Sequence, residues 1–258
     1  MIHRRGAGSE GIPAGITVHS YGGSSYTAPA MTVAATGTET ALSDFGTVLI
    51  DLDAHDLSSG SISSWPNRGN TSVMTAITQG TAANKPTYSA TGLNGGPAAQ
   101  FDGSDDYMGP QAYDSSHAQP FSEFLLIQVS TGNTGTFFVD GGDLTHRHAY
   151  NTQTGASGCY IYAGAALIDT GDHISLDVPH LIDTVFDTTT SDLTIDGTSR
   201  ATGDVGSQGN NGLVLANDPV LSSVAMKGFL AKYVVFSGVL SAGNRTSVRN
   251  LIKRAWGL

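Results

Sequence analysis

The C-terminal segment from Lys227 to Leu258 constrains the fold more than any other part of the chain. Phe229 to Phe236 carries β-branched and aromatic residues at the density of a β-strand, and Ser237-Gly238 ends the run. Ser241 can cap a following helix. Apolar residues then recur at intervals of three and four, at Val248, Leu251, Ile252, Ala255 and Trp256. Since the rest of the chain is strand-like, the sequence predicts an all-β protein closed by one helix near Ser241 to Trp256.

The polar side of this helix is basic, with Arg245, Arg249, Lys253 and Arg254. A basic amphipathic helix is compatible with a membrane surface, but its apolar stripe is short, so packing on a sheet is the favoured interpretation. Up to residue 220, six basic residues stand against 22 acidic ones, a formal charge of −16, and the six basic residues beyond it are unopposed. We therefore expect the basic tail to pair with the acidic body or a neighbouring subunit, and we expect no nucleic-acid or membrane partner.

Composition favours one large domain with many turns. Charged residues make up 13% of the chain, and 33 glycines, together with Thr, Ser, Asn and Asp, separate short apolar runs. Cys159 is the one cysteine, so no intrachain disulfide can form. On the predicted strand Cys159 to Ala163 it is interpreted as a small buried side chain, with a reactive thiol as the alternative.

Residues 1–45 are predicted to form an extended arm that docks onto other chains, and residues 46–258 the folded domain. The arm is rich in Gly, Ser, Thr and Ala, with two short strands predicted at Gly15 to Ser20 and Ala30 to Ala35. Its candidate contact residues are Arg4, Arg5, Tyr21 and Tyr26. The N-terminus has no apolar stretch of the kind found in a signal peptide, so export by the ordinary secretory route is not expected.

A series of short motifs runs in order through the folded part. They are Val48 to His55, Ser64 to Gly69 (SWPNRG), Asn94 to Met108 (NGGPAAQFDGSDDYM), His180 to Asp187, Asp192 to Thr198, and Phe229 to Leu240. The series resembles the concanavalin A-like lectin (laminin-G-like) superfamily, whose members carry similar "W-x-N/D-x-G" and "NGxPAxxFDGxDDYL" passages. The resemblance implies a two-sheet antiparallel jelly-roll sandwich. Each motif also has a structural role as turn or core, so Trp65 and Trp256 are interpreted as core residues in preference to sugar platforms.

Catalysis is not expected. If the chain were a glycosidase of this fold, the resemblance would imply a strand that carries paired acidic residues. The chain has three glutamates, Glu10, Glu39 and Glu123, and none lies in such a pattern. His146, His148 and Tyr150 alternate along a predicted strand, Thr145 to Tyr150, and so share one face. They are the candidate carbohydrate-binding residues, with a polar subunit-facing surface, a metal site at the two histidines, or a lyase or esterase site as alternatives.

Asp102, Asp105 and Asp106 offer oxygen ligands within one turn, so Ca²⁺ is a candidate ligand, as in members of the superfamily that bind it; no other cofactor is expected. Taken together, these observations favour a non-enzymatic structural protein of a bacteriophage virion, in the head decoration or the tail. In that role the chain would assemble as a homo-oligomer with capsid or tail proteins and bind host glycans. The alternative is a free carbohydrate-binding or adhesion module of a bacterial surface or secreted system.

Overall fold

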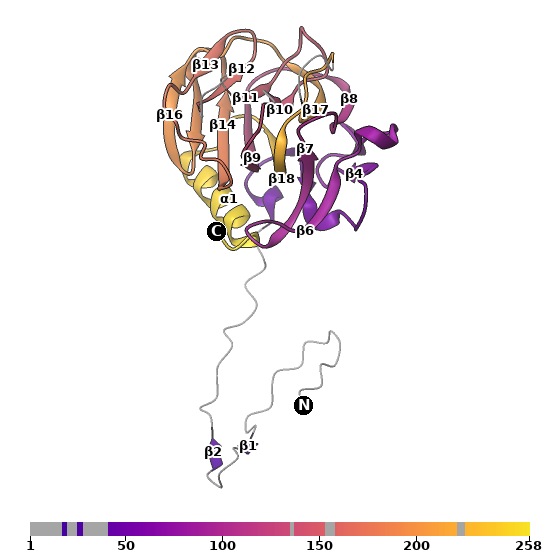
Figure 1. Cartoon of the computed structure of the whole chain (residues 1–258). Helices are drawn as coiled ribbons and strands as arrows, with labels where there is room; N and C mark the ends of the chain where they lie inside the picture. Colours follow the sequence, from indigo (N-terminus) through magenta and orange to yellow (C-terminus); the bar gives the residue numbers. More distant parts are fainter. Residues whose placement is uncertain (1–16, 20–24, 28–40, 135–136, 153–157, 221–224) are drawn as a thin grey trace. The chain divides into compact units, whose positions relative to one another are not determined.

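The computed structural model describes residues 17–19, 25–27, 41–134, 137–152, 158–220 and 225–258 (Figure 1). Contacts divide the chain into two units, Met1–Thr40 and Ala41–Leu258. In the first unit, β1 (Thr17–His19) pairs antiparallel with β2 (Ser25–Thr27). The predicted strand at Ala30 to Ala35 lies outside the described residues.

The second unit is a sandwich of two antiparallel sheets. The six-stranded sheet has the order β13-β12-β11-β10-β17-β8. Its strands are β8 (Met108–His117), β10 (Phe137–Asp140), β11 (Ala149–Thr152), β12 (Cys159–Tyr162), β13 (Ala166–Ile168) and β17 (Asn210–Leu215).

The eight-stranded sheet has the order β16-β15-β14-β9-β18-β7-β6, with β3 paired to β18 beside this path. Its strands are β3 (Val48–Asp53), β6 (Thr87–Leu93), β7 (Gly96–Asp102), β9 (Phe121–Val129), β14 (Pro179–Phe186), β15 (Ser191–Ile195), β16 (Thr198–Gly203) and β18 (Lys227–Ser237). A separate ribbon pairs β4 (Ser64–Pro66) with β5 (Ala76–Thr78). Four 3-10 turns complete the unit: η1 (Leu42–Asp44), η2 (Ala54–Asp56), η3 (Ala82–Asn84) and η4 (Thr188–Thr190).

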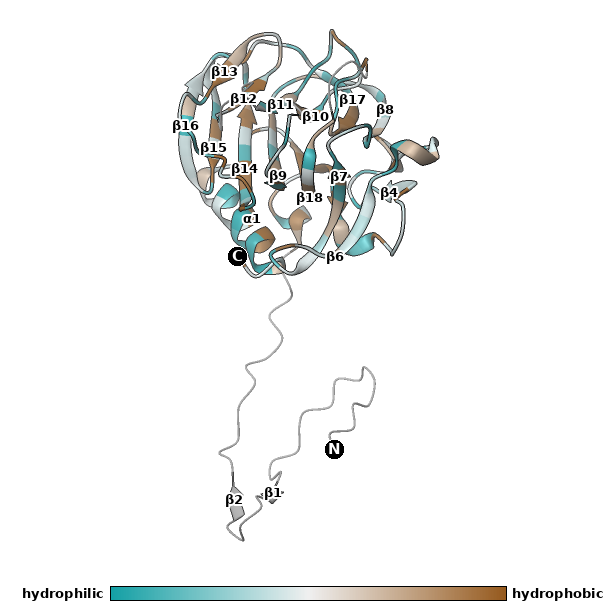
Figure 2. Cartoon of the chain, in the orientation of Figure 1, coloured by the Kyte–Doolittle hydropathy of each residue, from teal (hydrophilic) through white to brown (hydrophobic). Residues whose placement is uncertain are grey.

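The predicted all-β jelly-roll sandwich with a C-terminal helix is confirmed: among the described residues, α1 (Ala242–Ala255) is the one α-helix. No described helix is long and apolar enough to span a membrane. The central strands β9, β14 and β18 are buried almost throughout, because one face meets the six-stranded sheet and the other is covered by α1 and neighbouring segments. Many of their residues belong to the hydrophobic core, and their ribbons carry brown (hydrophobic) stretches in Figure 2.

Helix α1 begins where the sequence predicts it to begin. Ser241 is the N-cap, and its side chain accepts a hydrogen bond from the Asn244 N–H at 3.2 Å. Val248, Ile252 and Trp256 are buried. The predicted apolar stripe also included Leu251 and Ala255, and for these two residues the prediction of burial is wrong, since Leu251 is half-buried and Ala255 is exposed. Helix α1 lies in contact with β14 of the eight-stranded sheet.

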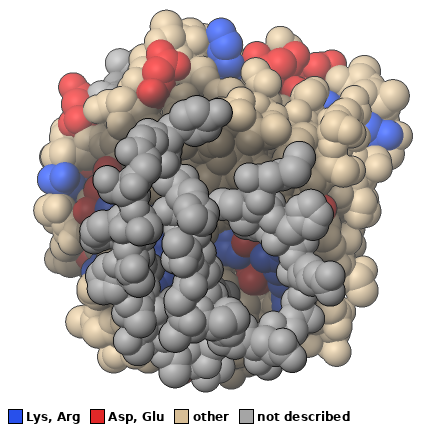
Figure 3. Space-filling model, turned by 90° about the horizontal axis from the view of Figure 1, so that it is seen from below, with Lys and Arg blue, Asp and Glu red and all other residues tan. Residues whose placement is uncertain are grey.

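Two of the four basic residues of α1, Arg245 and Arg249, pair with the sandwich, as predicted for the basic tail. Arg245 Nη2 lies 2.7 Å from an oxygen of Asp183, and Arg245 Nη1 lies 2.7 Å from Asp192. Arg249 Nη1 lies 3.0 Å from the same Asp183 carboxylate. Asp183 is fully buried, so these arginines are the counter-charges that its burial requires. On the face in Figure 3, the basic (blue) and acidic (red) side chains lie in small groups among uncharged residues.

The motifs act as fold determinants. Trp65 is buried, and its indole N–H donates to the Asp53 carbonyl oxygen at 3.1 Å. The Asn67 side-chain oxygen accepts from the backbone N–H groups of Asp51 at 2.7 Å and Gly69 at 2.9 Å. A Cβ on Gly69 would lie 2.7 Å from a backbone oxygen, so glycine is required there. Trp256 is also buried, which confirms both tryptophans as core residues, and Cys159 is a buried free cysteine as predicted.

Candidate functional site

The predicted strand from Thr145 to Tyr150 is wrong in its first half. Strand β11 begins at Ala149, and Thr145 and His146 belong to a turn whose N–H groups donate to an Asp143 side-chain oxygen at 2.7 and 2.9 Å. The carboxylate of Asp143 competes with a neighbouring strand for these donors, so the chain turns here. His146 keeps a partly exposed side chain beside Asp143.

His148 and Tyr150 point into the sandwich and are fully buried, so the interpretation of a ligand-facing or solvated surface is wrong for both. His148 Nδ1 lies 2.8 Å from one oxygen of Glu123, and Nε2 lies 3.1 Å from the Gln208 carbonyl oxygen. The Tyr150 and Tyr233 hydroxyls donate to the other oxygen of Glu123 at 3.0 and 2.7 Å.

This Glu123 cluster, composed of Glu123, His148, Tyr150 and Tyr233, joins the two sheets. Burial, and after it the charge of Glu123, raises the pKa of both tyrosines well above the ordinary value. The His148 ring also stacks on Phe186, with centroids 4.2 Å apart. A carboxylate enclosed by three donors holds the sheets in register, and at 0% exposure it offers no surface to a ligand.

The opposite, outward face of the six-stranded sheet brings together residues that the sequence did not single out. Register places Phe137 of β10 beside Asn151 of β11, and Asn151 beside Tyr160 of β12. Because side chains alternate along a strand, Tyr162 shares the face of Tyr160, while Tyr150 and Ile161 point inward. We call Phe137, Arg147, Asn151, Tyr160 and Tyr162 the tyrosine face.

Arg147 lies across the tyrosine face. Its guanidinium carbon is 5.1 Å from the Phe137 ring centroid and 5.5 Å from that of Tyr162. Nε donates to both carboxylate oxygens of Asp140, at 3.2 and 3.1 Å, and Nη2 pairs with the same group. Burial of Arg147 opposes its charge, but the hydrogen bonds and attraction from Asp140 outweigh this and raise its pKa above the ordinary value. The guanidinium is therefore fixed in position.

One buried side-chain atom of this face has no hydrogen-bond partner. Asn151 is 2% exposed, and its side-chain oxygen makes no hydrogen bond. Phe137, Tyr160 and Tyr162 are half-buried. A buried amide oxygen without a donor is costly, and a ligand that supplies a donor relieves that cost. The alternation of aromatic residues in Cys159-Tyr-Ile-Tyr162 is the signal in the sequence that could have indicated this face.

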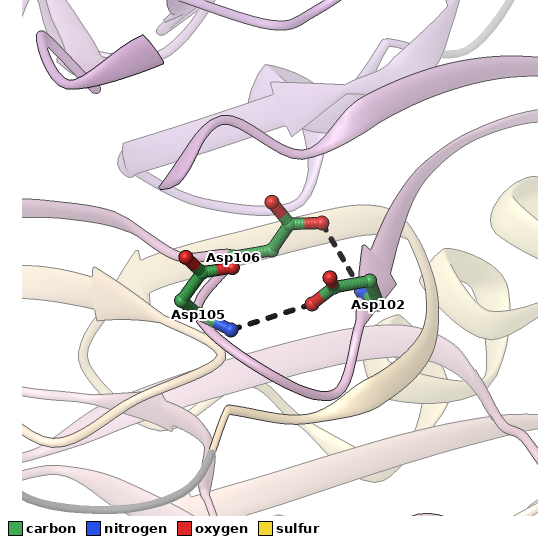
Figure 4. Close-up of side chains that lie close together, drawn as sticks. All are labelled: Asp102, Asp105 and Asp106. Carbon is green, nitrogen blue, oxygen red and sulfur yellow. Dashed lines mark hydrogen bonds between the residues drawn. The ribbon is translucent and has the colours of Figure 1, made fainter. Parts of the chain in front are cut away.

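The three aspartates of the predicted calcium site do come together (Figure 4). One ligand oxygen from each of Asp102, Asp105 and Asp106 lies within 4.8 Å of the others. Asp102 also accepts from the Ser104 and Asp105 N–H groups, and Asp106 accepts from the Asp102 N–H at 3.1 Å. Burial, and secondly the charge of Asp102, raises the pKa of Asp106 to about 6. The all-oxygen donor set is of the class that Ca²⁺ prefers, and the turn also has a purely structural role.

The structure describes no side chain among the candidate arm residues. Arg4, Arg5 and Tyr21 lie outside the described residues, and Tyr26 lies in β2 without a described side chain. At the other end of the predicted arm, Leu42 and Phe45 pack against the core of the second unit.

Comparison with known proteins defines a class by fold. No protein-family model matches the chain, and no curated protein matches it in sequence. Among solved structures, domain 4 of AbnA, an extracellular GH43 arabinanase from Geobacillus stearothermophilus solved with arabinotriose, aligns with a TM-score of 0.55 at 16% identity, over 79% of this chain and 98% of that domain.

Two further structures share the fold over a smaller part of their own length. The receptor-binding domain of botulinum neurotoxin D aligns with a TM-score of 0.56 at 10% identity, over 81% of this chain and 53% of that one. The Trypanosoma rangeli sialidase in complex with sialic acid aligns with a TM-score of 0.50 at 10% identity, over 79% of this chain and 32% of the sialidase. At these identities the similarity establishes a β-sandwich fold and nothing beyond the fold.

Proposed function

We propose that this chain is a non-enzymatic carbohydrate-binding protein and that the tyrosine face is its glycan-binding surface. The observation that carries the proposal is the cross-strand row Phe137–Asn151–Tyr160, with Tyr162 and the fixed Arg147 beside it. Tyrosine offers an apolar ring to the C–H groups of a sugar and a hydroxyl to its oxygens. Few, well-placed polar groups among aromatic side chains are typical of ligand sites.

The fold comparison gives an independent reason to test glycans. Domain 4 of AbnA was solved with arabinotriose, and this chain covers nearly all of that domain. A protein whose sandwich matches a sugar-binding one along its whole length is a reasonable candidate for the same class of ligand, although sites on one fold vary.

Binding without catalysis is supported by the burial and pairing of the acidic residues nearest to the tyrosine face. Hydrolysis of a glycosidic bond ordinarily uses two carboxyl groups that flank the sugar. Glu123 is enclosed in the core, and Asp140, the carboxylate next to the tyrosine face, is fully buried and paired with Arg147. Glu10 and Glu39 lie outside the described residues.

A glycan array followed by calorimetric titration of the best ligand tests the proposal. Tyr160→Ala is expected to weaken binding about tenfold, equivalent to roughly 1.4 kcal/mol. Tyr88→Ala is the matched control, because Tyr88 is a half-buried tyrosine on β6, in the other sheet, and is expected to change affinity little. No binding on the array, or equal losses in both variants, would refute the assignment of this face.

A second proposal concerns where the sandwich is displayed. We propose that residues 1–45 anchor it in a bacteriophage particle, in the head decoration or the tail, where it faces host glycans. Support comes from the Gly- and Ser-rich composition of this segment and from the division of contacts after Thr40. The competing proposal is a free adhesion module. Deletion of residues 2–40 distinguishes them: loss of incorporation into particles by a folded sandwich supports the anchor, and normal incorporation contradicts it.

A further inference from the structure

The charge around the tyrosine face allows its ligand class to be narrowed, on the condition that the proposed function holds. Arg147 is the cation of this face, and its Nε and Nη2 are both used by the fully buried carboxylate of Asp140. A second buried carboxylate, Asp218, acts electrostatically on both Arg147 and Asp140. The single positive charge of Arg147 therefore interacts with two negative charges, those of Asp140 and Asp218.

The other members of the face add no charge. Phe137 and Asn151 are uncharged side chains, and the tyrosines contribute neutral hydroxyl groups near neutral pH. An anionic sugar would have to take donors from Asp140, which would leave that carboxylate buried without its counter-charge. The hydroxyl groups of a neutral sugar meet no such obstacle, because they need no counter-charge and leave the pairing of Asp140 with Arg147 intact.

The spacing of the aromatic residues indicates the size of the ligand. Phe137 and Tyr160 lie on β10 and β12, with β11 between them. Two strand spacings amount to about 10 Å, which is wider than one sugar ring. A ligand that contacts both rings therefore consists of more than one sugar unit and runs across the strands.

We propose that the tyrosine face binds neutral oligosaccharides and discriminates against glycans that carry carboxylates. In this arrangement sugar rings lie against the half-buried rings of Phe137, Tyr160 and Tyr162. Asp140 is a specificity-determining residue, because it keeps Arg147 from acting as an anion receptor.

The test compares neutral and acidic oligosaccharides of equal length, namely arabinan against galacturonan fragments and galactosyllactose against sialyllactose, by titration with the full chain. Neutral ligands are expected to bind at least about tenfold more tightly than their acidic counterparts, and monosaccharides more weakly than trisaccharides. Affinity for neutral ligands should change little between about 0.05 and 0.5 M salt, because no charge pair forms.

Two variants test the role of Asp140. Asp140→Asn removes the carboxylate that is hydrogen-bonded to Arg147 and is expected to improve binding of the acidic ligands. Arg147→Met keeps a long side chain between the aromatic rings without the charge, and is expected to give no such gain. Near-UV circular dichroism reports whether each variant is folded; if Asp140→Asn is not, the ligand comparison in the wild type decides alone.

The outcomes separate this inference from the proposed function. Equal or tighter binding of acidic ligands by the wild type would overturn the inference and leave glycan binding intact. Failure to bind either class would overturn both. Binding of neutral ligands that Tyr160→Ala does not weaken would show that the site lies elsewhere and would also overturn the inference.

Discussion

Replacement of Glu123 by glutamine tests the interpretation of the Glu123 cluster. The wild-type carboxylate accepts from His148, Tyr150 and Tyr233 at 2.8, 3.0 and 2.7 Å, and all four side chains are fully buried. Nδ1 of His148 lies beside Glu123 and Nε2 beside the Gln208 carbonyl oxygen, so the ring is held at both nitrogens. Glutamine removes the charge and turns an NH₂ group toward donors.

Removal of one partner from a buried ion pair costs about 3–5 kcal/mol, a large fraction of the roughly 5–15 kcal/mol that stabilises a domain. We take about 3 kcal/mol for Glu123→Gln, because the amide oxygen retains one of the acceptor positions. For a domain of this size that loss lowers the Tm by about 6–12 °C. Urea unfolding followed by near-UV circular dichroism, together with calorimetry, measures both quantities.

The matched control is Asp114→Asn, since Asp114 pairs with His117 at 2.9 Å through the same chemistry on the exposed surface of β8. Solvent screens that pair, so its loss should leave the Tm nearly unchanged. If Glu123→Gln costs less than about 1 kcal/mol, or no more than the control, the cluster is not a charged network and the reasoning about it fails.

Three further predictions follow from the packing and the charges. Ile252→Ala is expected to cost about 3 kcal/mol in the free energy of unfolding, and the half-buried control Leu251→Ala clearly less, as measured by urea unfolding; equal costs would contradict the described packing of α1. The folded-state pKa of Asp106, about 6, lies above its ordinary value of 3.8, so stability should rise as pH falls from 7 to 4, by at most about 2 kcal/mol after solvent screening. Thermal melts of Asp106→Asn should lack this rise in stability at low pH. Ca²⁺ binding by Asp102, Asp105 and Asp106 would appear as a calcium-dependent increase in Tm at pH 7.5 that Asp105→Asn abolishes. The chain without residues 2–40 should unfold at nearly the wild-type Tm, because the core packing and ion pairs of the sandwich join residues within 41–258. A large decrease in Tm would show that the first unit stabilises the sandwich.

Local elements followed from the sequence wherever neighbouring residues determine the conformation. Asp196-Gly197 adopts positive φ at both positions, 52° and 86°, and closes the hairpin between β15 and β16, as a hairpin signal of this kind predicts. In the same way Gly103 adopts φ of 83° after Phe101, which is buried. Each depends on one or two residues that tolerate a conformation others avoid.

The candidate site could not be predicted in this way. Phe137, Asn151 and Tyr160 become neighbours only through the pairing of three strands, and Arg147 reaches them from the turn before β11. Glu123 lies within the apolar run Phe121 to Val129, a position that indicates a buried partner, but the sequence does not name that partner.

The sequence by itself determined the all-β class, the turns and the capped helix, because each depends on residues close together in the chain, whereas the two-sheet sandwich was implied by the family resemblance of its motifs. It also determined that alternate residues of a strand share a face, since the period of two is a property of the backbone. Which of the two faces turns inward was decided by the tertiary structure alone. His148 and Tyr150 are buried because the eight-stranded sheet presents Glu123 to them, and Tyr160 and Tyr162 are left outward on the neighbouring strand for the same reason.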